Sequence, residues 1–73
     1  MSNKETIKQR INDFRAFCAS NRIQYKEVTK AAGLNYRAVI VNMRLNVLSD
    51  ERMTLLEETA INLAEEKLQE SEH

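Results

Sequence analysis

The sequence predicts an all-α fold, a small four- to five-helix bundle that ends in a long C-terminal helix. Three observations favour this class: the 73 residues include no proline and one glycine, apolar residues recur every three or four positions, and polar capping residues separate these repeats. A chain of this length forms a single domain, residues 1–73, whose core lies near the lower limit for independent stability.

The first and last helices have clear signals at their starts. Ser2 and Glu5 have the spacing of a capping box, and an apolar stripe follows them. The stripe consists of Ile7, Ile11, Phe14 and Cys18, with Phe17 beside it. Near the other end of the chain, Ser49 or Asp50 caps a helix over about residues 50–69. The apolar face of this helix consists of Met53, Leu56, Ala60 and Leu63.

The only glycine stands at a predicted corner between two short helices. A helix over about residues 24–32 precedes Gly33, which suits the left-handed position just past a helix end. Asn35 is a good N-cap for a third helix over about residues 36–44, and Asn46 is its predicted stop. Two short helices joined by so tight a corner predict a helix-turn-helix over about residues 24–44.

At this corner the sequence resembles the lambda-repressor-like family, which includes the phage repressors and the Cro proteins. The residues that match the family pattern are Val28, Thr29, Gly33, Leu34, Asn35 and Val39. Leu55 and Leu56 look similar to the paired leucines of a following helix, so the resemblance covers roughly residues 5–65. Two positions depart from the pattern, because Thr29 replaces the usual alanine and Asn42 replaces a buried aliphatic residue. The second departure predicts that the third helix is either rotated or locally overwound relative to the family.

The resemblance implies a sequence-specific transcriptional regulator of the phage or mobile-element repressor type. Its third helix, about Tyr36 to Arg44, would enter the major groove of a palindromic double-stranded DNA operator. Arg37 would pair with guanine there, and apolar side chains would meet thymine methyl groups. The residues expected to contact DNA are Tyr25, Lys26, Asn35, Tyr36, Arg37, Ile40, Val41, Arg44 and Asn46. Lys4 and Lys30 would add long-range attraction.

The net charge of zero hides a division along the chain. Residues 1–48 include nine Lys or Arg side chains and three acids, whereas residues 49–73 include two bases and eight acids. This division fits either one face for a polyanion or two ordinary solvated helix surfaces. A single cysteine cannot form an internal disulfide, and no apolar run approaches the roughly 18 residues of a membrane span. We therefore expect a cytoplasmic protein without membrane contact.

A second interpretation keeps the fold but assigns it to protein binding. Ile40 and Val41 are adjacent β-branched residues that cannot both face a core already filled by Val39 and Met43. These two residues, or the acidic last helix, would then contact a partner protein. The aromatic rings of Tyr25 and Tyr36 also have a purely structural interpretation, as cover for the edge of the core.

The last helix predicts a homodimer. Leu55, Ile61 and Leu68 are left over once the core face is filled, and pairing two copies would bury them and fix the distance between two recognition helices. The alternative is a monomer whose last helix frays after about Ala64. No enzyme, cofactor or metal site is expected, because His73 is terminal and Cys18 lies on an apolar stripe.

Overall fold

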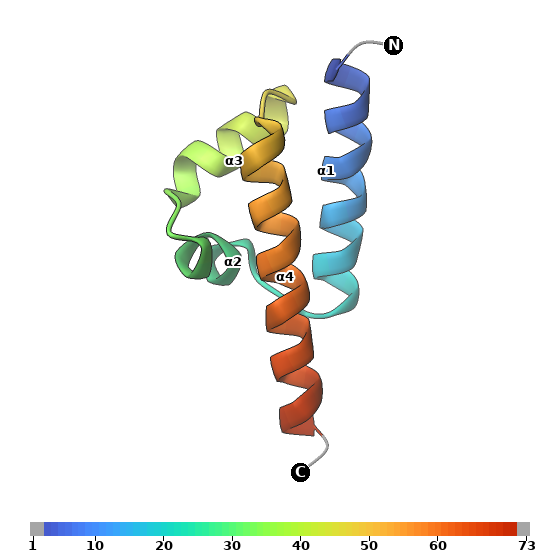
Figure 1. Cartoon of the computed structure of the whole chain (residues 1–73), viewed down its shortest axis with the longest axis vertical. Coiled ribbons are helices and arrows are strands. Elements are labelled where there is room, and N and C mark those ends of the chain that lie inside the picture. The colour runs from blue at the N-terminus through green and yellow to red at the C-terminus, as the bar shows by residue number, and fades with distance from the viewer. Residues whose placement is uncertain (1–2, 72–73) are drawn as a thin grey trace.

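The computed structural model describes residues 3–71, which form four α-helices and no strand (Figure 1). The helices are α1 (Asn3–Ser20), α2 (Tyr25–Ala32), α3 (Tyr36–Leu45) and α4 (Asp50–Ser71). The all-α class, the two short helices around Gly33 and the long C-terminal helix are thus confirmed, and α4 reaches 22 residues. The capping box predicted at Ser2 lies outside the described residues.

The long helix α4 is the centre of the arrangement. Figure 1 shows α1 alongside one side of α4 and the α2–α3 pair on its other side. Helix α4 contacts both α1 and α2, and α2 in turn contacts α3. The last turns of α4 extend beyond the other helices, which accounts for the long dimension of 45 Å against 24 Å and 17 Å in the other two. Within residues 3–71, no helix combines the length and the apolar character needed to cross a membrane.

The core is built on the apolar stripes predicted for α1 and α4. The buried residues of these two helices are Ile7, Ile11, Phe14, Cys18, Met53, Leu56 and Ala60. Three of them, Met53, Leu56 and Ala60, have no exposed surface at all. Because burying one large aliphatic side chain contributes about 1.5–3 kcal/mol, this double stripe supplies much of the favourable free energy of folding.

The corner at Gly33 has the predicted left-handed backbone, with φ 73° and ψ 28°. The N–H of Leu34 donates to the carbonyl of Thr29 over 2.9 Å, and the N–H of Gly33 donates to the carbonyl of Lys30 over 3.2 Å. This pair of bonds closes the end of α2 as a Schellman motif. Helix α3 then begins at once, because the side-chain oxygen of Asn35 accepts a bond from the Ala38 N–H over 3.0 Å.

The ends of α1 and α3 repeat this closure with residues that have a β-carbon. Arg22 and Asn46 both have φ 56°, in the left-handed region. The N–H of Ile23 donates to the carbonyl of Cys18 over 2.9 Å, and α3 is closed past Asn46 in the same way. Asn46 was the predicted stop of the third helix, and asparagine tolerates this backbone well. Arg22 carries no such sequence signal.

The two departures from the family pattern have simple structural solutions. The buried hydroxyl of Thr29 donates to the carbonyls of Tyr25 and Lys26, over 3.0 Å and 3.2 Å, so its polarity is satisfied within its own helix. In α3, Met43 is buried and Asn42 is only half buried. Helix α3 therefore fills the core with a four-residue step from Val39 to Met43.

Two substitutions at the left-handed corners should shift stability in opposite directions. We expect Gly33→Val to lower the free energy of unfolding by about 1–2 kcal/mol, since a β-carbon disfavours this backbone. No atom lies within 4 Å of a β-carbon placed there, so the loss comes from the backbone and not from a clash. We expect Arg22→Gly to raise the free energy of unfolding, by less than about 1 kcal/mol. Urea denaturation measures the free energy of unfolding of both variants. A Gly33→Val protein as stable as wild type would contradict the assignment of Gly33 as a left-handed helix cap.

Candidate nucleic-acid interface

The side of α3 that points away from the core carries two arginines with an apolar residue between them. Arg37, Val41 and Arg44 are all exposed, and spacings of four and three residues place them on one helical face. We call this set the outer face of α3. The 22 residues from 28 to 49 include no Asp or Glu, so no carboxylate adjoins these arginines in sequence. The outer face can therefore offer two cations and an apolar contact to the same ligand.

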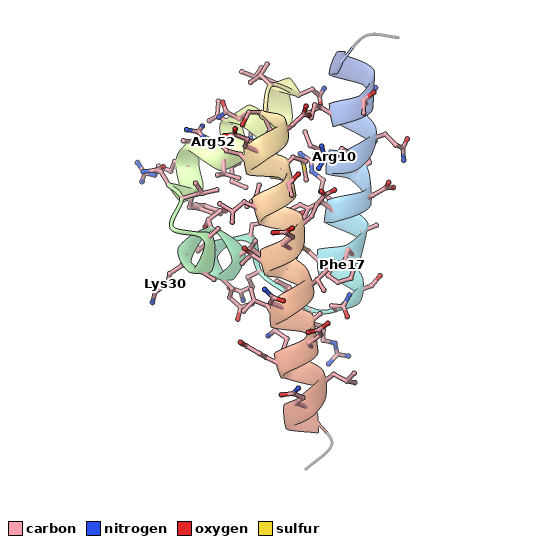
Figure 2. The ribbon with its side chains drawn as sticks, in the orientation of Figure 1. Arg10, Phe17, Lys30 and Arg52 are labelled. Carbon is pink, nitrogen blue, oxygen red and sulfur yellow. The ribbon has the colours of Figure 1, made fainter. Side chains whose placement is uncertain are left out.

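Helix α2 adds two exposed lysines next to this face. The Lys26 ammonium lies 5.5 Å from the centre of the Tyr36 ring, a cation–π contact that links the start of α2 to the start of α3. Figure 2 shows Lys30 projecting from α2 on the side of the molecule opposite to α1. Arg52 leaves the first turn of α4 on the side away from α1 as well (Figure 2). The side formed by α2, α3 and the start of α4 thus carries five exposed bases: Lys26, Lys30, Arg37, Arg44 and Arg52.

The start of α2 borders a hollow of about 370 Å³, which Tyr25, Lys26 and Tyr36 help to line. The Tyr25 ring stacks on Phe14 with 5.9 Å between ring centres. Burial raises the pKa of the Tyr25 hydroxyl above its ordinary value, so this group stays protonated at neutral pH. The first N–H groups of a helix have no partner inside it, and Lys26 adds a positive charge nearby. The N–H groups of Glu27 and Val28 donate to the Gln24 carbonyl over 3.0 Å and 3.3 Å, so a phosphate at this end of α2 would rely mainly on Lys26.

One carboxylate at the same helix start works against an anion. Glu27 accepts a hydrogen bond from the backbone N–H of Gln24 over 2.9 Å and lies 3.5 Å from the ammonium of Lys67. The backbone hydrogen bond, followed by the charge of Lys67, lowers the pKa of Glu27 below its ordinary value. Glu27 is therefore ionised at neutral pH, and Lys67 partly offsets its charge.

The nine residues predicted to contact DNA differ in exposure. The exposed ones are Lys26, Asn35, Arg37, Val41 and Arg44. The half-buried ones are Tyr25, Tyr36, Ile40 and Asn46. Ile40 packs against the core, and Asn35 and Asn46 both serve as helix caps. The outer face of α3 together with Lys26 is thus the accessible part of the predicted set.

Two exposed apolar residues at the end of α3 are not predicted from the sequence. Leu45 is 58% exposed and Val47 is 55% exposed. Leu45 lies one turn beyond Val41, so extending the four-residue spacing along α3 would have found it. Val47 follows the left-handed residue Asn46, where no periodic pattern applies.

The three residues predicted for a dimer do not share one surface. Leu55, Ile61 and Leu68 are 37%, 47% and 62% exposed. Ile61 and Leu68 are seven residues apart and lie on one flank of α4. At about 100° per residue, Leu55 lies roughly 120° further round the helix. A single pairing of two α4 helices therefore cannot bury all three residues.

Groups with reactive chemistry are few within the described residues. No three His, Cys, Asp or Glu side chains come together there in a way that could hold a metal ion. Cys18 is buried, and burial raises the pKa of its thiol to about 11. The side chain packs within the core, as its place on the stripe of α1 predicts.

A scan against protein-family models matches none of them, and comparisons with curated proteins and with solved structures give no match. The resemblance to the lambda-repressor-like family therefore stays a prediction from the residues around Gly33.

The buried thiol makes a simple test of the native packing. We expect alkylation of Cys18 by iodoacetamide at pH 8 to be at least about 100-fold slower in the folded protein than in urea, because a thiol with a pKa near 11 is protonated and covered. Mass spectrometry follows the reaction. Equal rates in the two states would show that Cys18 is not part of the core.

Proposed function

We propose that this protein is a sequence-specific double-stranded DNA-binding regulator that reads the major groove with the outer face of α3. The observation that carries the proposal is the pattern of this face, two exposed arginines around an exposed Val41, held just behind the left-handed corner at Gly33. Arginine pairs with guanine through two hydrogen bonds, and a valine methyl suits the methyl group of thymine. The resemblance to phage repressors adds to this support.

The arginines have different tasks in this proposal. Arg37 stands in the first turn of α3, where recognition helices reach base edges. Arg44 stands in the last turn, where a long cationic side chain suits a phosphate of the backbone. Lys26, beside the Tyr36 ring, holds a second phosphate at the start of α2. One helix thus supplies both base reading and positioning.

Titration of a fluorescent duplex tests these assignments. The duplex is obtained by selection from a random pool, and affinity is measured by anisotropy at several salt concentrations. We expect Arg37→Ala to lose discrimination at one base pair, by about 1–3 kcal/mol. We expect Arg44→Ala to weaken all sequences alike and to reduce the slope of log affinity against log salt by roughly one unit.

The matched control is Lys8→Ala, which removes one positive charge from an exposed position of α1. This variant should bind as wild type does, apart from a small change in long-range attraction. Wild-type protein that binds no duplex at low salt would refute the proposed function. Equal losses in all three variants would refute the assignment of α3 as the reading helix.

The pairing of two copies on DNA is a separate expectation. If the site is palindromic, selection should enrich an inverted repeat whose halves are about 10 base pairs apart, and two copies should bind it cooperatively. Leu68, in the last turns of α4 and 62% exposed, is the most accessible of the residues predicted for this pairing. Leu68→Glu should therefore reduce the cooperativity but leave single half-sites bound. Enrichment of one unrepeated site with a single copy bound would contradict the dimer.

A further inference from the structure

The flank of α4 next to α1 carries a surface opposite in charge to the outer face of α3. Glu58, Ile61 and Glu65 are exposed, and spacings of three and four residues place them side by side. Ile61 is 47% exposed between the two carboxylates. We call this set the acidic flank of α4.

A hollow between α1 and α4 adjoins the acidic flank. It measures about 440 Å³, and its apolar lining comes from Phe14, Phe17, Ala60 and Ile61. Phe17 lies between the two helices in Figure 2. An exposed apolar surface with charged residues around it is typical of a binding site for another macromolecule. The hollow can accept an apolar side chain, while charged side chains of the same ligand meet its rim.

The charge of this flank is not cancelled from within the molecule. Arg10 lies against Glu57, with distances of 2.6 Å and 3.4 Å to its two carboxylate oxygens, and also contacts Asp50 at 3.4 Å. Within residues 6–69, no basic side chain forms an ion pair with Glu58 or Glu65. Arg10 thus neutralises the inner carboxylate, and the outer two keep their charge for a ligand.

We propose that the acidic flank of α4 binds the outer face of α3 from a second copy of this chain. The two arginines of the outer face are seven residues apart, and so are the two glutamates of the acidic flank. Seven residues span about 10.5 Å of helix, so both ion pairs form at once when the two helices run antiparallel, with Arg44 on Glu58 and Arg37 on Glu65. The valine and the isoleucine between the charges then meet, and Leu45 falls toward the apolar hollow.

The pattern of charge selects a head-to-tail contact between copies. A symmetric pair of two acidic flanks would place glutamate against glutamate, which costs free energy at an interface. Every copy carries both surfaces, because Arg37 and Arg44 lie on α3 and Glu58 and Glu65 lie on α4.

This contact would regulate the DNA binding proposed above, and only this regulatory consequence rests on that proposal. The outer face of α3 cannot hold a duplex and a neighbouring copy at the same time. A head-to-tail contact does not close on itself, so association continues from copy to copy as the concentration rises. In protein that is not bound to DNA, the outer face of α3 would therefore be covered by a neighbouring copy.

Two variants with one damaged surface each provide the test. Val41→Glu damages only the outer face of α3, and Ile61→Glu damages only the acidic flank; both side chains are about half exposed, so the fold should be kept. Sedimentation equilibrium without DNA is run up to millimolar concentration. At concentrations where the wild-type protein associates, each variant alone should keep the monomer mass of 8.5 kDa. The association constant of each variant should be roughly tenfold or more below that of the wild type. The equimolar mixture has one intact contact and should form a closed 1:1 pair.

The control is Leu55→Glu, which adds the same charge on another flank of α4 and should associate as wild type does. Wild-type mass should rise steadily with concentration and fall when salt is added. A wild-type mass that levels off at a dimer, a mixture that stays monomeric, or a wild-type protein that never associates would overturn the proposal. These results are obtained without DNA, so failure of DNA binding and failure of self-association are separate outcomes.

Discussion

The stripe of α4 formed by Met53, Leu56 and Ala60 is the contact on which the rest of the structure depends. These side chains have no exposed surface, and α1 and α2 both pack against their helix. Helix α3 is placed less directly: it contacts α2, sends Val39 and Met43 into the core, and follows the left-handed corner at Gly33. Helix α3 is thus positioned by a corner and two buried side chains, which leaves its outer face exposed.

The fold places part of the division of charge along the sequence on separate surfaces. Helices α2 and α3 carry exposed bases on one side of α4, and the acidic flank of α4 lies on the other side, where α1 carries the exposed bases Lys8 and Arg15. Arg10 limits this division, because its bonds to Glu57 and Thr54 join α1 to α4 and remove one carboxylate from the acidic side. The hydrogen bond to Glu57 is the first cause of the raised pKa of the Arg10 guanidinium. Arg10 therefore pairs with Glu57, whereas the two carboxylates of the acidic flank stay exposed.

Local signals in the sequence were sufficient for the helices and for most of their ends. The caps at Gly33, Asn35 and Ser49 follow from residue type and spacing, and Ser49 does accept a bond from the N–H of Arg52 over 3.2 Å. The left-handed Arg22 could not be predicted in this way, because arginine has no preference for that backbone. The ion pair between Arg10 and Glu57 joins residues 47 positions apart, so only the packing of α1 on α4 reveals it. By contrast, counting 100° per residue along the last helix would have separated Leu55 from Ile61 without any structure.

The affinities of α3 for its two proposed partners, a duplex and a second copy, depend differently on salt concentration. This difference decides which partner is lost first as salt rises. Binding to a duplex releases counterions and weakens steeply with salt, by close to one power of concentration for each phosphate contacted. Two exposed ion pairs between copies are only screened, and the apolar contact of Val41 with Ile61 is not weakened by salt. Rising salt therefore removes non-specific duplex from α3 before it removes a neighbouring copy. Only DNA with the base sequence that Arg37 recognises then competes with the neighbouring copy for the outer face of α3. Self-association would in this way raise the specificity of a small protein whose reading face includes few side chains.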